Sequence, residues 1–88
     1  MIKIVKYALE QGPYQEVVMP KGANIISHGV QENEPFIWVE VDPNKVHVDR
    51  KFRIFITGDN IYETPLKYIG TFLLDYGHSV LHLYEELV

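Results

Sequence analysis

The sequence predicts an all-β protein with about seven short antiparallel strands in a small sandwich or barrel. Two observations carry this prediction. Apolar and polar side chains alternate with the period of two that is typical of half-buried strands. Gly, Pro, Asn and Asp separate these segments, and no sustained helical spacing supports a helix longer than about two turns.

The first predicted strand covers residues 2–9. Its apolar side chains alternate with polar ones, and the apolar positions change from even to odd numbers near Val5. A turn follows, and the second strand, residues 15–20, ends at Pro20, which cannot donate to a sheet ladder. Residues 21–24 break the chain. Residues 25–31 and 35–41 are then expected to form a hairpin, because the residues between them have the length of a hairpin loop.

The second half starts with a type I turn at residues 42–45, since its Asp and Pro suit the first two turn positions. The fifth strand is expected at residues 46–57, with a bend near residues 49–51. Residues 58–67 read as a long loop with room for one helical turn. The chain closes with a hairpin over residues 67–87, turning at residues 75–77.

Length and composition indicate one domain, residues 1–88, without a repeat or a linker. A chain of 88 residues buries only about 60–65% of the surface that it exposes when unfolded. Its core must be compact or extended by a partner. The hydrophobic fraction of 47% and the charged fraction of 23% are typical of globular domains.

Charge and cysteine content exclude several classes of function. A formal net charge of −4 argues against binding of long nucleic acid, which needs clustered Lys and Arg. Without Cys, neither disulfides nor a thiolate zinc site can form, which fits a reducing cytoplasm. We see no signal peptide or membrane span in the sequence and expect no membrane partner.

Each predicted strand has one aliphatic face and one mixed face with aromatic residues. We expect the mixed faces to carry Trp38, Phe55, Phe72 and Tyr84. By the same alternation, Tyr68 is expected on the same side of its strand as Phe72, and Thr71 on the opposite side. Monomers rarely leave such a surface bare. Sandwich packing, a symmetric copy or a ligand must therefore cover it.

Catalytic and metal-binding patterns are weak. His28, His47, His78 and His82 lack ligand spacing, so we expect no metal site and no cofactor. An enzyme would need a pocket joining Glu40 or Asp42 to His28 or His82. Known nucleophile and phosphate-loop motifs are missing from the sequence, and we expect a protein that is not an enzyme.

The strongest candidate for ligand binding is Arg53, with Thr57 on the same face of the fifth strand. Arg binds phosphate through two hydrogen bonds, and Thr adds a hydroxyl. Trp38, Tyr62 and Tyr68 could stack on a base, at roughly 1 to 3 kcal/mol each. The alternative is that Arg53 pairs with Glu40 or Asp42 on a neighbouring strand.

Four segments, "MPKGANIIS", "IWVEVDP", "FRIFITGDNI" and "YIGTF", give the chain a family resemblance. It resembles a family of small uncharacterised bacteriophage-encoded proteins that share this order of motifs, from about residue 6 to residue 85. Ile56 stands where the family pattern has a glycine. In size and β-rich character the chain is also similar to viral sponge proteins, which act against the bacterial CBASS defence by binding cyclic nucleotide signals.

The resemblance to sponge proteins implies a phage protein that binds and sequesters a small anionic nucleotide, such as a cyclic dinucleotide, and so helps the phage evade host immunity. It implies a homo-oligomer in the host cell cytoplasm. The residues themselves, and not this resemblance, suggest Arg53 on phosphate, Thr57 hydrogen-bonding and Trp38 and Tyr68 stacking, with Tyr62 as a further stacking candidate. The alternative is a protein-interaction module that inhibits a host factor through its acidic surface or an exposed strand edge.

Overall fold

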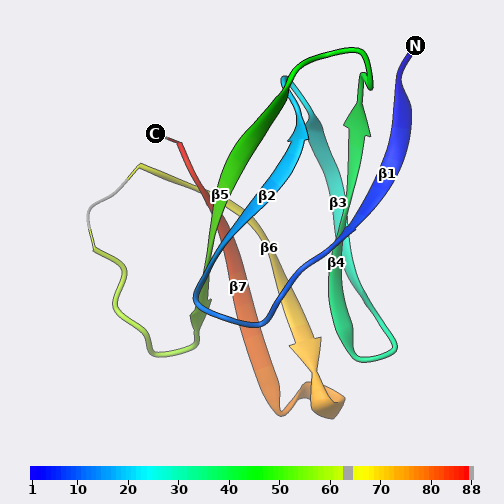
Figure 1. Cartoon of the computed structure of the whole chain (residues 1–88). Coiled ribbons are helices and arrows are strands. Elements are labelled where there is room, and N and C mark those ends of the chain that lie inside the picture. Colours follow the sequence, from blue (N-terminus) through cyan, green and yellow to red (C-terminus); the bar gives the residue numbers. More distant parts are fainter. Residues whose placement is uncertain (63–64, 88) are drawn as a thin grey trace.

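The computed structural model of the chain describes residues 1–62 and 65–87. Over these residues it confirms the predicted all-β fold, with seven strands and one short 3-10 segment, η1 (Asp75–Gly77) (Figure 1). In this described part, no helix is long and apolar enough to span a membrane. The strands are β1 (Lys3–Ala8), β2 (Tyr14–Pro20), β3 (Asn24–Gln31), β4 (Glu34–Val41), β5 (His47–Ile56), β6 (Leu66–Leu74) and β7 (Ser79–Glu86).

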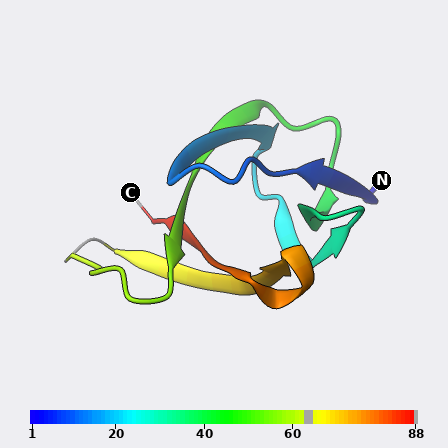
Figure 2. The same cartoon turned by 90° about the horizontal axis from the view of Figure 1, so that it is seen from below.

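The strands form two antiparallel sheets that pack on each other. One sheet has three strands in the order β1-β4-β3, and the other has four in the order β2-β5-β7-β6. Seen from below, the strands of both sheets surround a common centre (Figure 2). At one open side, β3 and β6 lie next to each other although they are edge strands of different sheets.

Alternate residues of the strands fill the space between the sheets. The three-stranded sheet contributes Ile37, Val39 and Val41 from β4, and each is almost completely buried. The facing sheet contributes residues from four strands, as period-two patterning requires. They are Met19, Phe52, Ile54, Phe72, Leu74, Leu81 and Leu83.

The expectation of one mixed face shared with Tyr84 is wrong for Phe72, and the expectation that Tyr68 lies on the side of Phe72 is also wrong. Phe72 lies in the core and is 1% exposed. Tyr68 is half exposed and pairs with Tyr84 on the outer face, together with Thr71. For Tyr68 the reason is a bulge in β6 between Tyr68 and Gly70, since the extra residue puts Tyr68 on the opposite face from Phe72. Phe72 pairs with Leu81, whose side chain also lies in the core.

Both predicted turns around β4 are present. Glu32 and Asn33 form a two-residue hairpin loop with φ of 51° and 61°, one residue shorter than expected. Positive φ at both positions matches the turn type that follows the twist of a hairpin. In the turn after β4, Asp42 accepts hydrogen bonds from the backbone N–H groups of Asn44 and Lys45.

The region after β5 differs in its bounds from the prediction. β5 ends at Ile56, where the backbone N–H donates to Asp59 Oδ2 at 2.9 Å and closes a turn. β6 begins at Leu66, so the loop is shorter than expected at its far end. Residues 63 and 64 of this loop lie outside the described residues.

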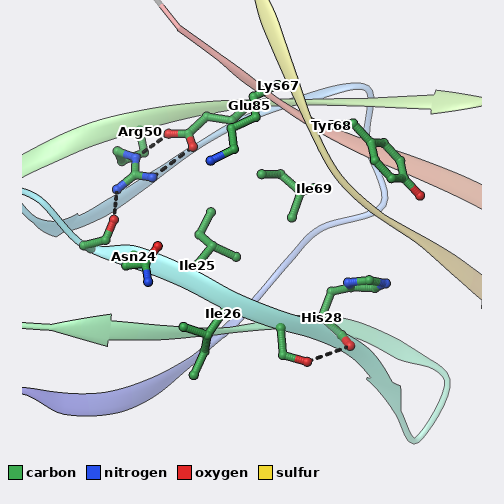
Figure 3. A pocket seen from close by; sticks show the side chains of 11 residues that line it. Asn24, Ile25, Ile26, His28, Arg50, Lys67, Tyr68, Ile69 and Glu85 are labelled. Carbon is green, nitrogen blue, oxygen red and sulfur yellow. Dashed lines mark hydrogen bonds and ion pairs between the residues drawn. The ribbon is translucent and has the colours of Figure 1, made fainter.

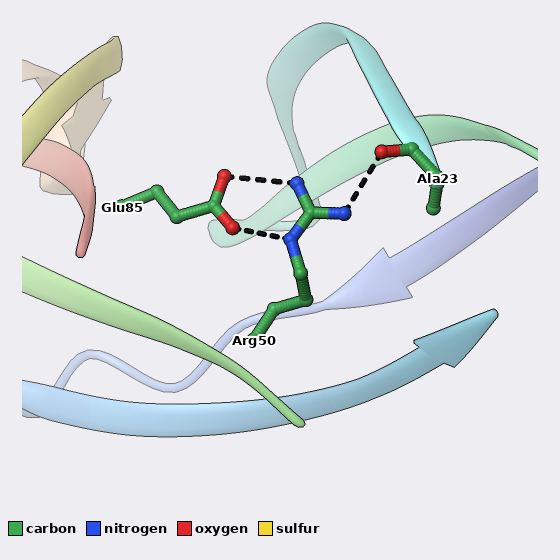
Figure 4. A network of polar contacts seen from close by, with 3 residues as sticks. All are labelled: Ala23, Arg50 and Glu85. Carbon is green, nitrogen blue, oxygen red and sulfur yellow. Dashed lines mark hydrogen bonds and ion pairs between the residues drawn. The ribbon is translucent and has the colours of Figure 1, made fainter. Parts of the chain in front are cut away.

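Polar contacts join the two sheets at both ends of the sandwich. At one end, Asn33 Nδ2 donates to Asp75 Oδ1 at 2.7 Å, and the Asp75 N–H donates back to Asn33 Oδ1 at 2.8 Å. At the other end, Arg50 donates through Nε and Nη2 to the carboxylate of Glu85 and through Nη1 to the backbone oxygen of Ala23 (Figure 4). The β3–β4 hairpin is thus connected to the opposite sheet at both ends.

The Arg50–Glu85 pair is largely removed from water. Glu85 is 7% exposed, and the Arg50 side chain is 21% exposed. Hydrogen bonds to Glu85 raise the pKa of Arg50, and their effect outweighs the opposing effect of burial. Because the two hydrogen bonds to one carboxylate are parallel, they also fix the orientation of the guanidinium plane.

His28 and Gly70 set the close approach of β3 to β6. The His28 ring lies over Gly70 and meets the ring of Phe72 edge-on, with 5.4 Å between ring centroids. A Cβ at Gly70 would lie 2.4 Å from His28 ring atoms. Glycine is therefore required at this position for the ring to keep its place.

We expect Gly70→Ala to lower the free energy of unfolding by about 1 kcal/mol, because the added methyl must push the His28 ring away from Phe72. Chemical denaturation measures this change. In a His28→Ala background the same substitution should cost much less, and Gly12→Ala is the control because no atom lies within 4 Å of its Cβ. An equal cost in both backgrounds would contradict the assigned contact.

Candidate functional site

One row of residues crosses the outer face of the four-stranded sheet. Tyr14 on β2 pairs with Arg53 on β5, Arg53 pairs with Tyr84 on β7, and Tyr84 pairs with Tyr68 on β6. Adjacent strands lie about 4.8 Å apart, so the row spans about 14 Å. Three tyrosines and one guanidinium therefore occupy neighbouring positions on a single surface.

A second row lies beside the first and carries a chain of hydrogen bonds. It consists of Phe55, His82 and Thr71 in register. His82 Nε2 is 2.9 Å from Thr57 Oγ1, and His82 Nδ1 is 3.1 Å from Thr71 Oγ1, which is 2.6 Å from the Tyr68 hydroxyl. Hydroxyls can donate and accept, so either tautomer of His82 completes the chain.

We call this surface the aromatic face and define it by Tyr14, Arg53, Phe55, Thr57, Tyr68, Thr71, His82, Tyr84 and Glu86. Its rings contact one another edge-on. The Tyr84 ring centroid lies 5.4 Å from that of Tyr68 and 5.5 Å from that of Phe55. Tyr14 and Tyr68 are 46% and 54% exposed, so parts of both rings remain accessible.

Arg53 pairs with Glu86, and neither Glu40 nor Asp42 is its partner. Its Nε donates to Glu86 Oε1 at 2.7 Å, and its guanidinium carbon lies 5.4 Å from the Tyr14 ring centroid. Glu40 belongs to the other sheet, where it accepts a hydrogen bond from Asn24. Among the described residues, no hydrogen bond or ion pair engages the two terminal nitrogens of Arg53.

The Tyr14 hydroxyl donates a hydrogen bond to the carboxylate of Glu16. Partial loss of solvent around the ring, followed by the hydrogen bond to Glu16 and the charge of its carboxylate, raises the pKa of Tyr14. The hydroxyl lies 3.2 Å from Glu16 Oε1. Arg53 opposes this shift weakly, because a nearby cation favours the phenolate.

Tyr62 lies near the edge of the aromatic face. Together with Arg53, Phe55, Leu66 and Glu86 it lines a hollow of about 50 Å³. Tyr62 is 78% exposed. The structure therefore brings Arg53, Thr57, Tyr62 and Tyr68 to one side of the molecule.

Trp38 is the one predicted ligand residue that the structure separates from the others. It lies on the outer face of the three-stranded sheet, where it pairs with Lys6 and Ser27. Its ring covers Gly29, and a Cβ there would be 3.0 Å from the Trp38 ring. The outer faces of a two-sheet sandwich point away from each other, so Trp38 and Arg53 of one chain cannot contact the same small ligand.

A groove of about 440 Å³ opens between β3 and β6 (Figure 3). Arg50, Glu85 and Lys67 lie at one end, Ile25 and Ile69 form the walls, and His28 lies at the other end. Its volume falls within the range of about 300–1,000 Å³ that is usual for small-molecule sites. Tyr68 is at its rim and belongs to the aromatic face as well.

The groove was not predicted from the sequence, although the alternation of residues in β5 and β7 points to the ion pair at one end of it. Arg50 shares the parity of Phe52 and Ile54, and Glu85 shares that of Leu81 and Leu83. Opposite charges on two faces that must be buried predict an ion pair, because an unpaired charge there is costly. Nothing local predicts that β6 comes next to β3, so the position of Lys67 could not be foreseen.

The histidines and carboxylates do not gather into a cluster in the described part of the chain. No group of three or more His, Asp or Glu side chains there could hold a metal ion. Glu40 bonds Asn24 on one sheet, and His82 bonds threonine hydroxyls on the other.

Comparison with known protein families gives one match, and it covers residues 1–88. The matching family is described as "Domain of unknown function (DUF7352)". The chain belongs to this family. No curated protein and no solved structure matches the chain. The DUF7352 family assignment names no function, so the function is argued from the geometry.

Two ion pairs in the described part of this DUF7352 domain, Arg50–Glu85 and Arg53–Glu86, offer a direct test of burial. We expect Glu85→Gln to destabilise the fold by about 3 kcal/mol, because it removes the carboxylate that neutralises the largely buried charge of Arg50. Glu86→Gln should cost less than about 1 kcal/mol, because Arg53 is 46% exposed and stays hydrated. Urea denaturation of both variants measures the difference, and equal costs would contradict the assigned role of the Arg50 pair.

Proposed function

We propose that the protein is a non-catalytic, homo-oligomeric binding protein that captures a small anionic nucleotide on its aromatic face. The proposed ligand class is cyclic dinucleotides. A phage protein that sequesters such a signal in the host cytoplasm would weaken the immune response that the signal triggers, as the resemblance to sponge proteins suggests.

The row Tyr14, Arg53, Tyr84 and Tyr68 carries this proposal. Exposed rings on a flat sheet stack on bases without enclosing them, at roughly 1–3 kcal/mol per base. The two terminal nitrogens of Arg53, which have no partner among the described residues, suit a phosphate group. The hydroxyls of Thr57, Thr71 and Tyr68 add donors and acceptors for sugar and base edges.

The homo-oligomeric part of the proposal follows from the shape of the aromatic face. Its hollow beside Arg53 has only about 50 Å³, far below the volume of about 300 Å³ at which small-molecule pockets begin. A flat platform buries one side of a ligand and leaves the other in water. A second copy of the face, placed over the ligand, would enclose it and would also cover the exposed tyrosines.

A second candidate is a protein-interaction module that inhibits a host factor. The observation that favours it is the free edge of β1, which pairs only with β4 and does so without a bulge. Ile2 and Ile4 at this edge are each 61% exposed. A partner strand could extend the sheet here. A stoichiometric partner captured from host lysate, with no effect of nucleotides on the protein, would favour this candidate.

Titration calorimetry with cyclic dinucleotides tests the nucleotide proposal. We expect binding to the unmodified protein, and Arg53→Gln should weaken it by about tenfold or more, because a charge-assisted hydrogen bond to phosphate is lost. Tyr68→Leu should weaken it by about tenfold through loss of one stacking surface.

Matched controls are Lys45→Gln for the cation and Tyr76→Leu for the ring. Lys45 lies in the turn after β4, and Tyr76 is fully exposed in η1, so neither belongs to the aromatic face. Both should leave the affinity unchanged. The proposal fails if no cyclic dinucleotide binds, or if the control variants lose as much affinity as the face variants.

A further inference from the structure

We propose that the groove between β3 and β6 is a separate binding site for a small organic anion, with a carboxylate or phosphate group on a planar or aliphatic body. The groove is formed by two edge strands of different sheets and opens beside the aromatic face. Its cations are Arg50 and Lys67, so it does not depend on Arg53.

The groove is positively charged in an otherwise acidic protein. Its lining residues include two cations, Arg50 and Lys67, and one carboxylate, Glu85, which leaves one positive charge with His28 neutral. The whole chain has a formal net charge of −4. The acidic Glu40 lies on the outer face, where Asn24 holds it at 3.1 Å, and does not line the groove. An anion in the groove would meet this local positive charge.

The positive end of the groove is already ordered. Arg50 is fixed by Glu85 and by the backbone oxygen of Ala23, so its remaining N–H groups have a set direction. Lys67 lies on the same end of the groove and is exposed (Figure 3). Within the described residues, Lys67 has no ion-pair partner. Because Arg50 is already held in place, its side chain loses little further conformational entropy when an anion binds.

The rest of the groove suits the body of such a ligand. Ile25 and Ile69 provide apolar walls, while His28 closes the far end and Tyr68 stands at the rim (Figure 3). An apolar or planar group lying between them would leave water and gain about 25 cal/mol per Å² of buried apolar surface. Charge at one end and apolar walls beyond it match an anion attached to a ring or a short chain.

Both strands that form the walls carry a bulge at the groove. The pairing of β3 shifts between Ile25 and Ser27, and that of β6 shifts between Tyr68 and Gly70. Bulges interrupt regular pairing and are frequent beside functional sites. Here both bulges lie at residues that line the groove.

Nuclear magnetic resonance titration with phenyl phosphate and with phenylacetate tests the proposal. We expect saturable shifts of the backbone amides of residues 24–28 and 67–70 with at least one of these anions. Comparison of the two anions identifies the preferred head group. Benzyl alcohol is the neutral control and should cause much smaller shifts, because the charged end of the groove then has no partner.

Lys67→Gln is the decisive variant, since an exposed lysine can be changed without unfolding the sandwich. It should weaken anion binding by about fivefold, the value of a partly exposed ion pair. Lys45→Gln and Arg53→Gln should leave binding in the groove unchanged, which also separates this site from the aromatic face. The proposal is overturned if neither anion shifts these amides, if benzyl alcohol shifts them equally, or if Lys67→Gln has no effect.

Discussion

The buried contact of Arg50 with Glu85 and with the backbone of Ala23 is the interaction on which the rest of the structure depends. It joins β5 and β7 of one sheet to the start of β3 in the other. A domain of this size has a small core, so contacts that fix the relative position of the sheets are disproportionately important. Asn33 and Asp75 make the corresponding connection at the other end.

Fixing the two sheets in this way creates two surfaces of different character. The outer face of the four-stranded sheet is flat and aromatic, with a guanidinium in the middle of its main row. The groove between β3 and β6 is concave, and Arg50 serves both as the structural link and as part of its positive end. A flat face favours ligands that stack and that a second subunit can cover, whereas a groove favours a small ligand with one charged end.

Period-two patterning predicted the strands and most of the core, because a strand with one buried face has an apolar residue at every second position. It also placed Arg53 and Thr57 on one face. It failed at Tyr68 because the bulge at Ile69 puts Tyr68 on the opposite face from Phe72. It failed at Phe72 because both faces of this strand carry apolar residues, so parity alone does not say which face meets the core. It grouped Trp38 with Arg53 because parity defines the sides of each strand but does not say which strands share a sheet.

Native mass spectrometry of the purified protein, with a cyclic dinucleotide added in excess, tests the central claim most directly. The aromatic face requires a second copy to enclose a ligand, so the account predicts a homo-oligomer that retains the nucleotide at a fixed stoichiometry. A monomer that carries no added mass under the same conditions would contradict it.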